Sequence, residues 1–147
     1  MSEANGNLPK KLAEIVDDFN LLVGREKLEH LLYFAENFPE LPQGIEIIKD
    51  EDHQIHECMT PVFIESRIVD GKMRFYFDVP EESPTVRGYA SLMHQGTYDV
   101  TPEQVLAIPN DFYTKMDLQG VISGQRINGL TGLLRQMKLL AAHELER

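Results

Sequence analysis

The side chain with the most reactive chemistry in this sequence is its single cysteine, Cys58, in the segment 55–63, IHECMTPVF. A cysteine thiolate is a nucleophile and a metal ligand, whereas a lone cysteine is most often a small buried hydrophobic residue. Because Glu57, Thr60 and Pro61 are poor core residues, the segment is predicted to be a loop, where a thiol is accessible enough to react. Both interpretations of the cysteine, reactive and buried, remain open on these residues alone.

A thiolate at Cys58 would need a nearby positive charge, since Glu57 and the acidic character of the chain both disfavour it. The candidates are His53, His56 and Arg126, and adjacency in sequence does not decide which of them faces the sulfur.

Arg126 belongs to the segment 122–130, ISGQRINGL, which is an unusual start for a helix because it contains two glycines. One interpretation is a frayed N-terminus capped by Ser123, or tight helix packing at Gly129. The functional interpretation is that Gly129 lets another element approach closely while Arg126 points at a site. A helix N-terminus with an arginine would favour a nearby thiolate or persulfide anion.

A cysteine can also serve three other kinds of chemistry, namely zinc binding, iron–sulfur cluster ligation and hydrolysis. Zinc could use His53, His56 and Cys58 with Asp52 or Glu57, but the second pair of ligands that a structural site needs is missing, so no metal is expected. An iron–sulfur cluster typically needs four thiolates, and the chain has one. A cysteine hydrolase stays possible because five histidines could act as a base, although none has a local signature: His30, His53, His56, His94 and His143.

The overall charge excludes other partners. The chain carries 24 acidic against 14 basic residues, a formal net charge of −10, which argues against binding to nucleic acid and to an anionic membrane surface. No apolar stretch approaches the roughly 20 residues that cross a bilayer, and the first residues lack the basic and apolar regions of a secretion signal. A cytoplasmic protein is expected.

The elements that must position Cys58 follow from periodicity. Apolar residues at helical spacing predict helices over 9–24 and 25–37, the second ending before Pro39, and 42–54 is expected to be an extended connection. The strands 62–69 and 73–79 flank Asp70-Gly71, a pair that favours a two-residue type I′ turn. Alternation along the second strand places Met73, Phe75, Phe77 and Val79 on the covered face and Lys72, Arg74, Tyr76 and Asp78 on the other.

The second half of the chain is predicted to be helical. Ser83-Pro84 should start a helix that reaches about Gln95, with Ser83 as its N-cap, and Thr101 to Gln104 form a capping-box pattern. A brief helix near 110–112 and a long amphipathic helix over 123–146 complete the chain. We therefore expect one α+β domain over 1–147, with N-terminal and C-terminal helices packed on an antiparallel sheet built on the hairpin, and a disordered N-terminus of about residues 1–8.

The segment around Cys58, the hairpin and the segment 123–130 together resemble the SufE/CsdE family of sulfur acceptors. The family's centre reads roughly Val-x-Gly-Cys-x-Ser-x-Val-Trp, and residues 55–63 are similar to it. Thr85-Val86-Arg87-Gly88 is similar to the family's Ile-Val-Lys-Gly helix opening, and the turn at Thr101-Pro102-Glu103 and the Ser-x-x-Arg-x-Asn-Gly-Leu segment also match. The resemblance covers about residues 10–142. The chain departs from the pattern at Glu57, which replaces a glycine, at Pro61, and at 80–83.

This resemblance implies a SufE/IscU-like fold and a role in iron–sulfur cluster biogenesis. Cys58 would accept a sulfane sulfur as a persulfide from a SufS/CsdA-type cysteine desulfurase, stimulate that enzyme, and pass the sulfur to a SufB-type cluster scaffold. Pyridoxal phosphate would belong to the desulfurase, so no cofactor is expected on this chain. Arg126 is expected to stabilise the anion or contact the partner, unless it forms a purely structural salt bridge, and His56 is a weaker candidate for proton handling. The alternatives are a regulator that binds a desulfurase without carrying sulfur, and a cysteine hydrolase.

Overall fold

The computed structural model describes residues 7–147 and has the predicted α+β architecture, five α-helices and a two-stranded antiparallel hairpin. The expected disordered N-terminus, about residues 1–8, falls mainly outside the described residues, and Leu8 packs into the core. The elements in chain order are α1 Lys10–Asn20, α2 Arg25–Glu36, β1 Phe63–Val69, β2 Lys72–Asp78, α3 Pro84–Gly96, α4 Pro102–Leu106, the 3-10 helices Phe112–Met116 and Leu118–Gly120, and α5 Gly124–Leu145.

The hairpin has the register that its turn residues predict. Val69 pairs with Lys72, so that Asp70 and Gly71 alone form the turn, and both have positive φ, 54° and 78°. Two consecutive residues with positive φ define the type I′ turn, which glycine adopts without strain and aspartate tolerates.

Burial along β2 departs from the predicted alternation at one position. Met73, Phe75 and Phe77 are buried as expected, but Tyr76 on the other face is also only 4% exposed. Its ring lies against the ring of His94 from α3, with 5.6 Å between centroids. The predicted solvent face of β2 is therefore covered at this position, because a ring from α3 packs on it.

The first helix ends earlier than periodicity predicts. α1 stops at Asn20 rather than at residue 24, and the apolar Leu21 and Val23 beyond it are 81% and 78% exposed. The ammonium group of Lys27 in α2 donates a hydrogen bond of 2.8 Å to the carbonyl of Phe19, one of the last carbonyls of α1. A cationic side chain can satisfy such a carbonyl, which helps the chain to leave the helix there and turn back into α2.

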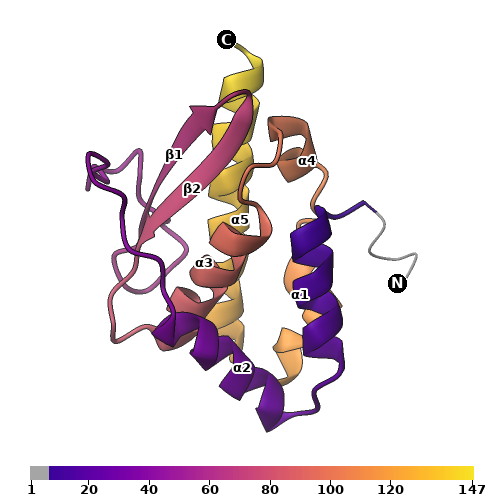
Figure 1. Cartoon of the computed structure of the whole chain (residues 1–147). Coiled ribbons are helices and arrows are strands. Elements are labelled where there is room, and N and C mark those ends of the chain that lie inside the picture. Colours follow the sequence, from indigo (N-terminus) through magenta and orange to yellow (C-terminus); the bar gives the residue numbers. More distant parts are fainter. Residues whose placement is uncertain (1–6) are drawn as a thin grey trace.

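Helix α3 lies in the middle of the molecule, with α5 behind it, the hairpin on one side, and α1 and α2 to the right and below (Figure 1). The buried side chains form one connected cluster that draws on all of these elements. α2 approaches α3 so closely that a Cβ at Gly88 would lie 2.2 Å from the carbonyl oxygen of Leu31. This packing fixes the start of α3, which contributes residues to the candidate site.

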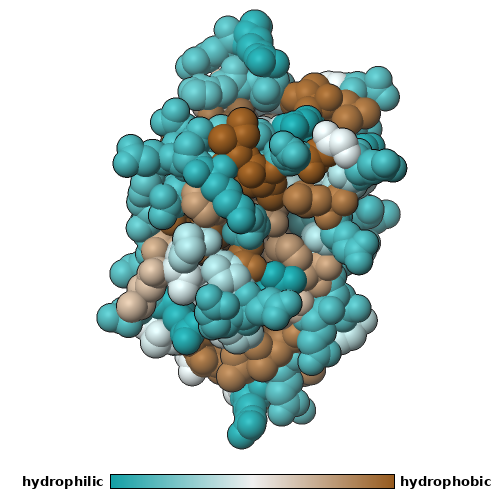
Figure 2. Space-filling model, turned by 90° about the vertical axis from the view of Figure 1, so that its left-hand side faces the viewer, coloured by the Kyte–Doolittle hydropathy of each residue, from teal (hydrophilic) through white to brown (hydrophobic). Residues whose placement is uncertain are grey.

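The side of the molecule that carries the hairpin is covered mainly by hydrophilic side chains, with apolar patches between them (Figure 2). Ile68 and Val69 at the end of β1 are among the exposed apolar residues, at 38% and 37%. Within residues 7–147, no helix combines the length and apolar character needed to cross a bilayer.

Candidate functional site

Cys58 lies in a loop whose base is closed by backbone hydrogen bonds. The amide of Ile55 donates to the carbonyl of Val62 at 2.8 Å, and the amide of Ile64 donates to the carbonyl of His53 at 2.9 Å. The part of the connection next to β1 thus runs beside that strand, and residues 56–61 form the loop that the sequence predicts. Within it, the Cys58 amide donates to the Ile55 carbonyl at 3.3 Å, which keeps the turn compact.

The thiol of Cys58 is turned inward against α5. Its S–H group donates a weak hydrogen bond of 3.8 Å to the carbonyl of Gly129. A Cβ at Gly129 would lie 3.0 Å from Sγ and 3.7 Å from Cγ2 of Val86 in α3. Gly129 therefore permits the close approach considered for it, and the element that approaches is the cysteine loop.

This inward position keeps the thiol protonated. Burial, and secondarily the charge of Glu57, raise the pKa of Cys58 from 9.0 to about 11. Since the thiolate is the nucleophilic form, the resting cysteine is a protected thiol at neutral pH. The loop must move, or its surroundings must change, before the sulfur can attack another atom.

A pair of hydroxyl groups ties the far side of the loop to α3. Thr60 Oγ1 lies 2.7 Å from Ser83 Oγ, and Ser83 is 4% exposed. Ser83 occupies the predicted N-cap position of α3, but its side chain makes no capping hydrogen bond. Ser83 is thus the N-cap residue as predicted, and its hydroxyl pairs with the cysteine loop rather than with the backbone of α3.

Arg126 and Cys58 line the same cavity, although they do not contact each other through a hydrogen bond. Arg126 Nη1 donates to Thr85 Oγ1 at 3.1 Å, which directs the exposed guanidinium toward the start of α3. The cavity has a volume of about 310 Å³ and is lined by Cys58, Met59, Thr60, Glu82, Ser83, Val86, Ser123, Gln125, Arg126 and Gly129. A guanidinium and the N-terminus of α5 therefore border the space into which the sulfur can turn, and both favour an anion.

The two histidines nearest to Cys58 in sequence do not reach this cavity. His56 is exposed and its Nε2 lies 2.9 Å from the carbonyl oxygen of Glu51. His53 lies between two carboxylates, with Nδ1 2.6 Å from Asp50 Oδ1 and Nε2 3.4 Å from Glu65 Oε2. The cavity contains no histidine among the described residues, so the Cys-His pair that a hydrolase requires is not formed there. The proton-handling role of His56 stays a prediction.

The hypothetical zinc ligands do not assemble into a site either. In the part of the chain from residue 7 onward, no group of three or more His, Cys, Asp or Glu side chains is arranged to hold a metal ion.

The sequence did not predict that Glu57 pairs with Arg135 of α5, 78 positions away in the chain. Arg135 donates two hydrogen bonds to the Glu57 carboxylate, Nε to Oε2 at 2.5 Å and Nη2 to Oε1 at 3.0 Å. These hydrogen bonds are the main reason that the pKa of Glu57 is lowered. A sequence signal was present at Gly132, a glycine inside the long amphipathic helix, where helix propensity alone disfavours it.

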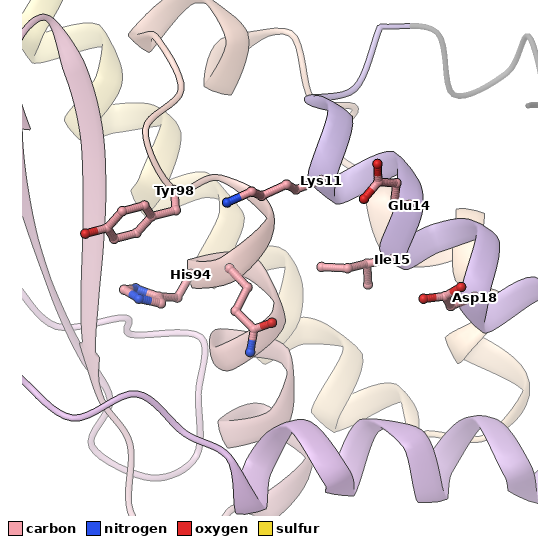
Figure 3. A pocket seen from close by; sticks show the side chains of 7 residues that line it. Lys11, Glu14, Ile15, Asp18, His94 and Tyr98 are labelled. Carbon is pink, nitrogen blue, oxygen red and sulfur yellow. The ribbon is translucent and has the colours of Figure 1, made fainter.

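A second cavity, of about 440 Å³, lies between α1 and α3 (Figure 3). His94 and Tyr98 face it from one side, and Lys11, Glu14, Ile15 and Asp18 from α1. His94 Nδ1 lies 2.6 Å from the carbonyl oxygen of Phe75, so this nitrogen donates its proton to β2. Burial lowers the pKa of His94, and the neutral ring joins α3 to β2.

Replacing His94 by glutamine is expected to flatten the pH dependence of stability. Folding lowers the pKa of His94 from 6.5, so below about pH 6.5 the unfolded chain binds more protons than the folded protein does. The stability that is present above pH 6.5 is therefore lost progressively as the pH falls below this value. Denaturant unfolding measured from about pH 7 to pH 5 should show a smaller loss for His94→Gln than for the natural chain. His143→Gln, at an exposed position, is the control and should keep the natural slope. A pH dependence of stability in His94→Gln equal to that of the natural chain would contradict the lowered pKa of His94.

Comparison with known proteins agrees with this architecture. The SufE family profile, described as an Fe-S metabolism associated domain, matches residues 13–141. An uncharacterised SufE-like protein of Mycobacterium tuberculosis is 36% identical over 136 residues, which cover 92% of this chain and 94% of that protein. An uncharacterised SufE-like protein of Synechocystis is 27% identical over 140 residues, covering 94% of this chain and 84% of that protein.

The fold is also that of a solved structure. The solution structure of a hypothetical protein from Thermus thermophilus superimposes with a TM-score of 0.81 at 32% identity, covering 95% of this chain and 99% of that one. The family profile covers nearly the whole chain, including the cysteine loop, the hairpin and most of α5. The chain therefore belongs to the SufE family of proteins of iron–sulfur metabolism.

Proposed function

We propose that this protein is a sulfur carrier, in which Cys58 accepts a sulfane sulfur from a SufS/CsdA-type cysteine desulfurase and delivers it to a SufB-type cluster scaffold. The observation that carries the proposal is the position of the single cysteine. It lies in the loop 56–61, beside a cavity that is also lined by Arg126 and the N-terminus of α5. Membership of a family linked to iron–sulfur metabolism supports the same chemistry.

The transfer step is an exchange between sulfur atoms without net oxidation. The Cys58 thiol first gives up its proton, and the thiolate attacks the outer sulfur of the persulfide on the desulfurase. A new S–S bond forms at Cys58, the S–S bond on the desulfurase breaks, and the desulfurase cysteine leaves as a thiolate. The product is a Cys58 persulfide, which passes its outer sulfur to the acceptor by the same exchange.

The resting geometry requires the sulfur to leave its contact with Gly129 before this attack. Turning further into the cavity takes Sγ away from the Gly129 carbonyl and brings it nearer to Arg126 and the first turn of α5. Loss of burial lowers the pKa of the thiol, and a cation with a helix N-terminus stabilises the anion that forms. Arg126 is accordingly assigned to anion stabilisation, or to contact with the partner, and His56 to a weaker role in proton transfer.

The test measures how this chain changes desulfurase turnover. The desulfurase is assayed with free cysteine as substrate, and alanine release is followed with and without this protein. The natural chain should raise the rate, whereas Cys58→Ser should leave it at the level of the desulfurase alone, because no acceptor thiol removes the sulfur. If Cys58→Ser stimulates as well as the natural chain, the protein is a regulator that binds the desulfurase without carrying sulfur.

A further inference from the structure

The carboxylate of Glu57, the residue before Cys58, binds to α5, the helix that Cys58 Sγ also contacts. Glu57 accepts two hydrogen bonds from Arg135, at 2.5 Å and 3.0 Å, in an ion pair whose side chains are only 32% and 44% exposed. A bidentate pair between a guanidinium and a carboxylate fixes orientation as well as distance. The ion pair therefore fixes the loop to α5 at the residue that precedes Cys58.

The side chain of Glu57 lies directly on a glycine of α5. A Cβ at Gly132 would lie 2.5 Å from Cδ, 2.7 Å from Cβ and 2.7 Å from Oε1 of Glu57. Any other residue at this position would displace the Glu57 side chain from the surface of the helix. A glycine inside a helix destabilises it relative to alanine, so its presence here accompanies a close contact.

Three positions of α5 spaced by three residues act together on the loop. Gly129 contacts Cys58 Sγ, Gly132 contacts the Glu57 side chain, and Arg135 binds the Glu57 carboxylate. Residues three apart are neighbours on the surface of a helix, so Glu57 and Cys58 lie against adjacent positions of α5. A movement of Cys58 away from Gly129 must therefore also displace Glu57 and strain its ion pair with Arg135.

We propose that the Glu57–Arg135 pair, seated on Gly132, is a latch that holds Cys58 inward, and that its release is the step that exposes the thiol. Glu57 and Arg135 are thus positioning residues, which act on the sulfur through the conformation of the loop. The inference deepens the proposed sulfur-carrier function by naming what controls access to its site.

The test uses alkylation of the free protein by iodoacetamide, which reports exposure of the one cysteine without any desulfurase. In Arg135→Gln, electrostatics and the latch predict opposite results. Removing the guanidinium leaves the Glu57 charge unneutralised beside the thiol, which by itself would slow alkylation. Release of the latch predicts alkylation about tenfold faster, since a charge-assisted bidentate pair is lost. Arg135→Lys should be intermediate, because lysine keeps the charge without the bidentate geometry.

A second variant disrupts the latch by a substitution in α5 that changes no charge. Gly132→Ala places a methyl group where Glu57 lies, so it should accelerate alkylation while α5 gains helix propensity. The matched control is Asp99→Asn, which breaks the Arg74–Asp99 ion pair between β2 and the segment after α3. Asp99 has a φ of 62°, which asparagine tolerates, and this variant should alkylate at the natural rate.

Faster alkylation in both Arg135→Gln and Gly132→Ala, with melting temperatures showing that both are folded, supports the latch. A natural or slower rate in either folded variant overturns it. Because alkylation involves no partner, failure of the latch leaves sulfur transfer untouched, and failure of sulfur transfer leaves the alkylation result standing.

Discussion

Free, folded protein is expected to alkylate at Cys58 about a hundredfold more slowly at about pH 8 than an unperturbed thiol. The reason is that burial and the Glu57 charge raise the pKa of Cys58 from 9.0 to about 11, which lowers the thiolate fraction by two orders of magnitude. Iodoacetamide with mass detection measures the rate. Raising the pH should increase it through pH 9.0 and beyond, rather than bring it to a plateau there.

The same cysteine provides its own control. In denaturant the chain exposes its single cysteine, which should then react at the rate of a free thiol. A folded-state rate within about threefold of the denatured rate would contradict the protected resting state, since it corresponds to a pKa raised by less than half a unit. Addition of a cognate desulfurase is expected to raise the rate, because docking must release the sulfur for transfer.

The second large effect concerns stability. Gly88→Ala is expected to destabilise the fold by about 3 kcal/mol, because its Cβ would lie 2.2 Å from the backbone oxygen of Leu31. A backbone atom cannot rotate away, so α2 and α3 must separate, and the gain in helix propensity of about 1 kcal/mol from alanine is too small to compensate. Urea unfolding measures the change in free energy.

The control for that substitution is Gly124→Ala at the start of α5. A Cβ at Gly124 meets nothing within 4 Å, so alanine there should stabilise the fold by about 0.5 kcal/mol. If Gly88→Ala were also neutral or stabilising, the close packing of α2 on α3 would be wrong, and with it the placement of Val86 and Ser83 at the site.

The elements that depend on local patterns were predictable. Asp70-Gly71 and the flanking alternation correctly predicted the hairpin and its turn, and Thr101 with Gln104 forms the predicted capping box. Tyr76 was predicted to lie on the exposed face of β2, because alternation along a strand carries no information on His94, which packs on that face. Ser83 was correctly predicted as the N-cap residue of α3, but the pairing of its hydroxyl with the distant Thr60 follows from no local pattern.

The residues around Cys58 were predictable only in part. The loop and the close approach at Gly129 follow from composition and from the position of a glycine near the start of a helix. The Glu57–Arg135 pair could not be derived, because it depends on how α5 lies against a loop 78 residues earlier. The inward orientation of the Cys58 thiol, which raises its pKa, also depends on how α5 packs against the loop. It could therefore not be predicted from any local pattern either.

The measurement that tests the sulfur-carrier function most directly is the mass of this protein after incubation with a cysteine desulfurase and free cysteine. We expect a gain of one sulfur atom, located on the peptide that contains Cys58, removed by a reducing thiol, and absent from Cys58→Ser. A desulfurase that turns over in the presence of this chain without adding sulfur to Cys58 would contradict the proposed function.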